Sequence, residues 1–216
     1  MIPPAPTVGV RLTERHQRLV EEMEAIFLSE GFRDLTVNDL AARLRCSKRT
    51  LYELAPTKQE IVLLVMERWL ARVRYMGSLA AAEKLDPADR MQAYLTPGVT
   101  ESAMASSRFV EDVQSLRPAT LLLEAHQRER INVLREIVEN GVRSGRFRPV
   151  HAHLVAEMCL ASIARFNQPE FLRDAGLSFS EAFSELYQIL TEGLAPRSGT
   201  RRGRRDTSRP SASEKA

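Results

Sequence analysis

The sequence predicts an all-α protein built in two parts. Apolar residues recur at helical spacing in one segment after another, and no stretch alternates convincingly as a strand does. Ser, Thr or Asp caps and Gly or Pro stops separate these segments. The 216 residues, 44% of them hydrophobic and 27% charged, suffice for a sizeable core. We therefore expect a small N-terminal three-helix unit followed by a larger helical domain.

The first helix is expected over residues 13–29, with Gly31 as its stop. Two short helices follow, the first capped by Thr36 with Asp39 as its capping-box partner and the second capped by Ser47. Their inward apolar positions are Val37, Leu40, Ala41, Leu44, Cys46, Leu51 and Leu54. This arrangement predicts a helix-turn-helix, in which the second helix presents the polar side chains of its first turn to a DNA groove.

Positive charge gathers where this helix pair would meet DNA. Five basic residues between positions 43 and 58 face the single acidic Glu53: Arg43, Arg45, Lys48, Arg49 and Lys58. This surplus of four is the electrostatic footprint expected of a DNA-binding surface. The basicity of the whole chain is weaker evidence for DNA binding. Residues 196–216 carry seven Arg or Lys against two acidic residues, so the net charge of residues 1–195 is −2. Taken alone, the pair also fits two helices of an ordinary bundle with a solvated basic face.

The surroundings of the helix pair favour the DNA-binding interpretation. The run from Ala25 to Ile61, about the first third of the chain, resembles the DNA-binding domain of the TetR family of bacterial transcription regulators. The matching pieces are Phe27-x-x-x-Gly31-Phe32, Thr36-Val37, Leu40-Ala41, Ser47-Lys48-Arg49-Thr50-Leu51-Tyr52 and Lys58. The resemblance implies that DNA is contacted by Thr36, Ser47, Lys48, Arg49, Thr50, Tyr52 and Lys58, and we add Arg45 as a candidate contact that does not follow from the family pattern.

The implied roles differ along this segment, and two positions depart from the family pattern. Lys48, Arg49 and Thr50 would reach base edges or flanking phosphates, whereas Tyr52, Thr36 and Lys58 would contact phosphates. Arg45 stands where the family usually has a turn glycine, and Ala55 stands where an aromatic residue is usual. A left-handed Arg would cost about 1 kcal/mol relative to Gly. Either the turn has another shape, or Arg45 gains a phosphate contact.

The remaining segments predict further helices, whose order is similar to the ligand-binding and dimerisation domain of the same family. A long helix is expected over residues 58–82, a short one between Pro87 and Pro97, and others over 101–116, 118–144 and 150–166. A short helical piece would follow to Asp174, and a last helix would start at Ser178. The expected parts are a mobile 1–12, a DNA-binding domain 13–60, an effector-binding and dimerisation domain 61–195, and a disordered basic tail 196–216.

Two surfaces are expected in the larger domain. An effector cavity would be lined by Met66, Trp69, Val73, Phe109, Leu122 and His126. As an alternative, the Met and Trp residues belong to the hydrophobic core and line no cavity. For His126 the alternative is a core histidine that is hydrogen-bonded to a neighbour, and we favour this alternative. A homodimer interface would be formed by Leu154, Met158, Ala161, Ser162, Phe179, Phe183, Leu186 and Leu190.

The sequence does not predict an enzyme, a metal site or a cofactor. It contains no Gly-rich phosphate loop and no Gly-x-Ser-x-Gly, and His151 and His153 would point about 200° apart on a helix. The two cysteines form no disulfide framework, which favours a reducing cytoplasm. Cys46 either fills an apolar slot, which we favour, or is a redox sensor with a lowered thiol pKa. No apolar run is long enough for a membrane span, and no signal peptide is apparent.

The predicted function is a DNA-binding transcriptional regulator. We expect a homodimeric repressor that binds a near-palindromic operator and is released by a small-molecule effector. One alternative is a constitutive DNA-binding protein with a filled, ligand-free body. The other is a helical enzyme or small-molecule carrier with a vestigial helix-turn-helix. The identity of the effector and the sequence of the operator are not encoded in any motif.

Overall fold

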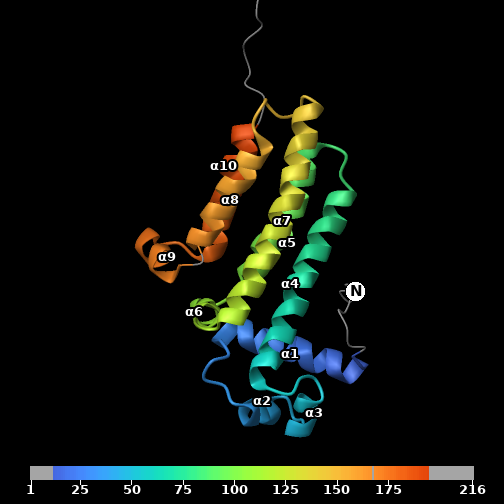
Figure 1. Cartoon of the computed structure of the whole chain (residues 1–216), viewed down its shortest axis with the longest axis vertical. Coiled ribbons are helices and arrows are strands. Elements are labelled where there is room, and N and C mark those ends of the chain that lie inside the picture. Colours follow the sequence, from blue (N-terminus) through green and yellow to red (C-terminus); the bar gives the residue numbers. More distant parts are fainter. Residues whose placement is uncertain (1–11, 167, 195–216) are drawn as a thin grey trace, which may run out of the picture.

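The computed structural model describes residues 12–166 and 168–194, and this part of the chain is folded into ten α-helices without a strand (Figure 1). The helices are α1 (Glu14–Glu30), α2 (Val37–Arg43), α3 (Lys48–Tyr52), α4 (Lys58–Ala82), α5 (Pro87–Ser102), α6 (Ser107–Ser115), α7 (Arg117–Arg143), α8 (Ala152–Phe166), α9 (Pro169–Ala175) and α10 (Phe179–Leu194). The all-α prediction is confirmed. The predictions for the two termini lie outside the described residues, apart from Leu12, which is buried.

The helices α1 to α3 form a head at one end of the elongated molecule (Figure 1). The expected caps Thr36 and Ser47 are present, since their side chains accept hydrogen bonds from backbone N–H groups of α2 and α3, and Thr13 caps α1 in the same way. Thr36 and Asp39 complete a reciprocal capping box. These signals are local, which is why the sequence located the starts of the short helices.

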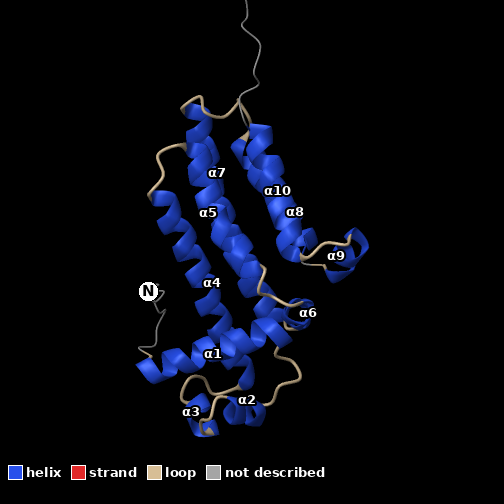
Figure 2. Ribbon diagram, turned by 180° about the vertical axis from the view of Figure 1, so that it is seen from behind, coloured by secondary structure: helices blue, strands red, loops and turns tan. Residues whose placement is uncertain are grey.

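The body consists of long helices that run away from the head (Figure 2). α4 leaves the head and packs against α5 and α7, while α8 and α10 lie side by side on one flank. No helix in the described residues is both long and apolar enough to span a membrane.

The predicted helix stop at Pro97 is wrong. α5 continues through Pro97 and Gly98 to Ser102, and α6 consequently starts at Ser107 rather than near residue 101. Both residues are buried in α5, where Gly98 leaves space for a side chain of α7: a Cβ there would lie 2.8 Å from Nη2 of Arg130. Packing against neighbouring helices therefore outweighs the hydrogen bond that the proline removes.

Two hydrophobic clusters make up the core. The first contains the inner faces of α1 to α3 and continues past residue 60 into α4 as far as Val73, and into Phe109 and Val113 of α6. The second lies in the body, among α5, α7, α8 and α10. Head and body are therefore joined by continuous packing through α4 and α6, rather than by a linker.

Candidate nucleic-acid interface and effector cavity

The turn between α2 and α3 and the outer face of α3 carry exposed polar side chains at the end of the head. Arg45, Lys48, Arg49 and Tyr52 are all exposed there. Arg49 lies 3.4 Å from Glu53, a weak surface pair. Within the described residues, no carboxylate lies at ion-pair distance from Arg45 or Lys48. This surface offers exposed positive charge and a phenol hydroxyl, groups that can bind DNA phosphates and base edges.

Arg45 adopts the left-handed conformation that a turn glycine would have, with φ 50°. Of the two alternatives, a differently shaped turn is therefore wrong, and a phosphate contact of Arg45 stays a prediction. The amide of Cys46 donates to the carbonyl of Ala41 at 3.0 Å, and that of Arg45 donates to Ala42 at 3.3 Å, so the end of α2 is satisfied by the turn itself. Arg45 therefore has a strained left-handed backbone, and its side chain is exposed.

Thr50 does not reach outward as predicted. Its side chain is buried in the head, and its hydroxyl lies 2.9 Å from that of Ser47. The Ser47 hydroxyl also accepts from the Thr50 amide at 3.1 Å. Position 50 follows Arg49 by one residue, about 100° around the helix, and this rotation brings it against the core. Thr50 therefore shapes the start of α3 and does not present its hydroxyl to solvent.

Thr36 and Lys58 stand at the starts of α2 and α4, but both are engaged within the head. The Thr36 hydroxyl serves the capping box of α2. The Lys58 ammonium donates to the carbonyl of Arg33 at 2.7 Å. Burial lowers the pKa of Lys58, while the carboxylates of Asp112 and Asp34 act in the opposite direction. Lys58 thus holds the loop after α1, in addition to any contact that it makes with DNA.

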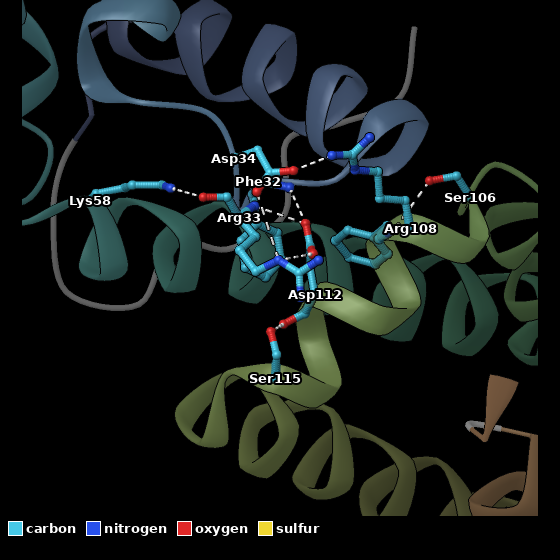
Figure 3. Close-up of polar contacts among 9 residues, drawn as sticks. Phe32, Arg33, Asp34, Lys58, Ser106, Arg108, Asp112 and Ser115 are labelled. Carbon is cyan, nitrogen blue, oxygen red and sulfur yellow. Dashed lines mark hydrogen bonds and ion pairs between the residues drawn. The ribbon is translucent and has the colours of Figure 1, made fainter.

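A polar junction joins the head to α6 (Figure 3). Asp112 of α6 accepts through Oδ2 from the backbone amides of Phe32 at 2.6 Å and Arg33 at 2.8 Å. Nε of Arg33 lies 3.5 Å from Oδ1 of the same carboxylate, and Arg108 pairs with Asp34. The carboxylate thus binds the backbone amides that follow α1. No local pattern in the sequence announces this pairing across 80 positions.

Gly31 makes this junction possible. Its φ of 81° and ψ of −178° are accessible essentially to glycine alone. A Cβ at this position would also lie 2.4 Å from Oδ2 of Asp112. The predicted helix stop is therefore also the point at which α6 comes closest to the head.

A cavity of about 290 Å³ lies among α4, α5, α6, α7, α8 and α10. Of the predicted lining, Met66, Trp69, Val73, Phe109 and His126 border it, but Leu122 does not. The neighbouring Leu123 takes that place, because the rotation of α7 by one residue decides which leucine faces inward. His126 is both a bonded, buried histidine and part of the cavity wall.

The charged groups near the head end of the cavity are paired. Glu101 accepts from the Trp69 indole at 3.0 Å and from Arg72 at 2.7 Å. Arg72 also forms two hydrogen bonds with Glu24 of α1. Burial raises the pKa of Glu24, and its bonds to Arg72 oppose this shift. These contacts form a second polar link between the head and the body.

The wall also contains a histidine that remains uncharged at neutral pH. Burial, assisted by the charges of Arg130 and Arg74, lowers the pKa of His126 to about 3. Its Nδ1 lies 3.1 Å from Nη1 of Arg74. Since the guanidinium is always a donor, Nδ1 accepts this bond and the neutral ring carries its proton on Nε2.

Arg130 is a cavity residue that the sequence analysis missed. It is 8% exposed, donates from Nη2 to the carbonyl of Tyr94 at 3.2 Å, and stacks over the Tyr94 ring at 5.0 Å. The signal was available, because Arg130 follows His126 by one helical turn and shares its face of α7.

The flank made by α8 and α10 has an exposed apolar stripe on α8. Leu154 and Met158, one turn apart, are 58% and 59% exposed, and Ala161 continues the stripe. The predicted interface residues of α10 lie differently: Phe183 is buried in the core of the chain itself, and Phe179, Leu186 and Leu190 pack against that core. Phe183 is thus unavailable to a second copy, because the apolar side of α10 covers the body. Ser162 is half-buried.

The cysteines have no features of reactive thiols. Burial raises the pKa of the Cys46 thiol, opposite to the shift that a redox sensor requires. Cys159 is buried and its pKa rises to about 11. In the part of the chain that the structure describes, no three His, Cys, Asp or Glu residues gather as a metal site.

Comparisons with known proteins agree with this geometry. The family model for bacterial regulatory proteins of the tetR family matches residues 20–65. An uncharacterised HTH-type transcriptional regulator of Bacillus subtilis, YvaF, is 23% identical over 180 residues, which cover 82% of this chain and 94% of that protein.

Solved structures share the fold over most of both chains. A transcriptional regulator from Saccharomonospora viridis, in complex with choline, has a TM-score of 0.68 at 15% identity, with 84% of this chain and 97% of that chain covered. A TetR-family regulator from Agrobacterium tumefaciens has a TM-score of 0.65 at 15% identity, with coverage of 84% and 98%.

Proposed function

We propose that this chain, a TetR-family transcriptional regulator with a helix-turn-helix DNA-binding domain, is a homodimeric repressor that a small molecule releases from a near-palindromic operator. Residues 13–60 would bind DNA in the cytoplasm, and residues 61–195 would bind the effector and a second copy. One observation carries the proposal: α6 borders the cavity with Phe109 and Val113 while its Asp112 holds the backbone that follows α1.

DNA would be bound by the exposed surface of α3. Lys48 and Arg49 are available for base edges or phosphates, and Arg45 and Tyr52 extend the surface toward the backbone. A two-fold dimer would place two such heads on DNA, so the half-sites should lie about one helical turn, or a multiple of it, apart.

Release would follow from the shared helix. A ligand that displaces Phe109 or Val113 moves α6, and Asp112 transmits this movement to the loop that follows α1. A second route runs from Trp69 and Glu101 at the cavity to Glu24 in α1 through Arg72. A ligand that prefers one arrangement of these contacts shifts the population of heads away from the spacing that fits DNA.

The dimer would form through the α8 flank. The stripe of Leu154, Met158 and Ala161 is apolar, exposed and continuous along one helix face, which is typical of an association surface. Because two-fold interfaces are self-complementary, the same stripe would face its copy. In this proposal, α10 supports α8 from within the subunit.

The DNA-binding proposal is tested by selecting bound sequences from random DNA and then measuring affinity for the selected site at several salt concentrations. Lys48→Ala or Arg49→Ala should reduce the slope of log affinity against log salt by about one unit if the residue contacts a phosphate. Relaxed preference at particular base pairs would instead identify a base contact. Lys84→Ala, an exposed lysine beyond the far end of α4, is the matched control. Unchanged binding in both α3 variants would refute this assignment.

The regulatory proposal is tested by screening small molecules for release of the selected site. If none releases it, the protein is a constitutive DNA-binding protein. For the dimer, Leu154→Glu combined with Met158→Glu should yield a monomer by light scattering, because each charge would be buried without a partner. Leu85→Glu, at a 99% exposed position between α4 and α5, should leave the dimer intact. A wild-type monomer at micromolar concentration would contradict the proposal.

A further inference from the structure

The cavity wall contains a buried positive charge with unused hydrogen-bonding capacity. Among the described residues, Nη1 of Arg130 has no hydrogen-bond partner. No carboxylate in that part of the chain lies within ion-pair distance of this guanidinium either. A buried guanidinium normally has a carboxylate or several acceptors around it, because leaving its charge unpaired costs free energy. Arg130 has one backbone carbonyl, one aromatic ring and, close by, the hydroxyl of Tyr187, and none of these groups carries a negative charge.

The other titratable groups of the wall do not compensate this charge. Glu101 is committed to Arg72 and the Trp69 indole. Glu124 is partly exposed and lies 3.6 Å from each of two surface arginines, Arg117 and Arg128. Each of these carboxylates therefore already has a partner of its own.

The two titratable rings close to Arg130 are uncharged. His126 is neutral, as its low pKa requires. Burial raises the pKa of Tyr187, although the Arg130 charge opposes this shift, so its hydroxyl stays protonated. The space next to Arg130 is thus positive and lacks an anion from the described chain.

Most of the remaining wall is apolar. Its apolar lining includes Leu95, Ile131, Leu134, Ile163, Phe183, Trp69, Met66 and Phe109. The proton on Nε2 of His126 is a further neutral donor in the wall. A ligand that complements both the Arg130 guanidinium and the apolar wall needs one anionic group that accepts hydrogen bonds and an uncharged apolar body.

We propose that the effector of this cavity is an apolar monocarboxylate whose carboxylate pairs with Arg130. This inference rests on the proposed function and specifies its ligand. A carboxylate matches a guanidinium with an unused nitrogen, while a phosphate monoester would bring a second charge for which the wall has no further cation. The volume of about 290 Å³ sets the size to that of a small organic acid.

The chain carries its own reporter for the test. Trp69 is the single tryptophan, and it borders the cavity. The full-length protein is titrated at neutral pH with octanoate, 1-octanol and octyltrimethylammonium, and with cyclohexylacetate and 2-cyclohexylethanol as a second apolar body. Trp69 fluorescence and calorimetry report binding. At least one acid should bind about tenfold or more tightly than its matched alcohol, because only the acid forms a charge-assisted pair.

Arg130→Met should remove this preference by weakening the acid and leaving the alcohol unchanged. Arg130→Lys should retain part of the preference for the acid, because the positive charge remains while the paired N–H donors of the guanidinium are lost. Arg128→Met, on the exposed face of the same helix, should bind the acid as the wild type does. Circular dichroism and thermal melting check that each variant is folded. If Arg130→Met does not fold, the comparison of acid with alcohol in the wild-type protein still tests whether the cavity prefers a carboxylate.

Three results would overturn the inference. The first is that neither acid binds more tightly than its matched alcohol, which includes the case in which no acid binds. The second is that octyltrimethylammonium binds more tightly than octanoate, and the third is that a folded Arg130→Met variant binds the acid with wild-type affinity. Release of the selected DNA site is measured separately. An acid that binds through Arg130 but leaves DNA affinity unchanged would support the ligand class and refute effector release. Release of the DNA by a neutral or cationic molecule would support effector release and refute the proposed ligand class.

Discussion

The junction between head and body and the wall of the cavity each contain a buried charge, but within the described residues only the charge at the junction lies at ion-pair distance from an opposite charge. Asp112, 1% exposed, accepts through Oδ2 from two backbone amides, while its Oδ1 has no hydrogen-bond partner in the described residues but lies 3.5 Å from Nε of Arg33. Arg130, 8% exposed, has one carbonyl and one ring, with Nη1 unpartnered within the described residues. The comparison contrasts a charge that holds two parts of the protein together with a charge that, in our proposal, pairs with a ligand.

The difference has an energetic consequence. Removing a satisfied buried charge leaves its partners without bonds, which costs more than the bonds themselves contributed. Removing a poorly satisfied buried charge also removes its desolvation penalty, so an apolar residue of similar volume is often tolerated. Four changes test this contrast, and we order them by the expected size of their effect.

Gly31→Ala should have the largest effect. It forces a side chain into a glycine conformation and places a Cβ 2.4 Å from Oδ2 of Asp112. We expect a loss of about 4 kcal/mol in the free energy of unfolding, measured with urea. Gly176→Ala is the control, because φ there is also positive but nothing lies within 4 Å of the new Cβ; about 1 kcal/mol is expected. Equal losses in the two variants would show that Asp112 does not require close approach at Gly31.

Asp112→Ala should destabilise the protein by about 3 kcal/mol, because the amides of Phe32 and Arg33 lose their acceptor. It should also uncouple effector binding from DNA release, while cavity binding measured by Trp69 fluorescence persists. Glu111→Ala, an exposed neighbour on α6, is the control. An Asp112→Ala variant with wild-type stability and release would remove the junction from the mechanism.

His126 should make the cavity region sensitive to acid. Its pKa is lowered from 6.5 to about 3 by burial, so below pH 6.5 the unfolded chain binds a proton that the folded chain does not. Stability therefore falls as the pH falls from about 6.5 towards 3. The contribution amounts to about 2 kcal/mol between about pH 7.5 and about pH 5.

Unfolding of His126→Gln should be less dependent on pH across this window, whereas His153→Gln, at an exposed position, should retain the wild-type profile. In Arg130→Met the pKa of His126 should rise, because one of the charges that lower it is gone. Nuclear magnetic resonance of the histidine ring measures this directly. An unchanged profile in His126→Gln would assign the acid sensitivity elsewhere.

Arg130→Met should have the smallest effect on stability. The lost bond to the Tyr94 carbonyl and the removed desolvation of the guanidinium oppose each other, and we expect a change within about 1 kcal/mol. Chemical unfolding in the absence of ligand measures it. A loss as large as that of Asp112→Ala would mean that both charges are structural, and the contrast between the two regions would fail.

The sequence by itself determined the features that depend on local physics. Thr36 and Ser47 cap their helices because the hydroxyl, the amide and the spacing lie within one turn. The seam of Met66, Trp69 and Val73 was recognisable because residues three and four apart share a helix face. The all-α fold and the head followed from such patterns, as did five of the six predicted cavity residues.

Only the tertiary structure decided which of two adjacent residues faces inward and what meets across the chain. Leu123 rather than Leu122 borders the cavity, and Thr50 is buried, because helix rotation is set by packing against neighbours. Pro97 stays within α5 because neighbouring helices compensate the hydrogen bond that it lacks. Asp112 meets the amides of Phe32 and Arg33 across about 80 positions, a pairing that depends on the fold and has no local signal.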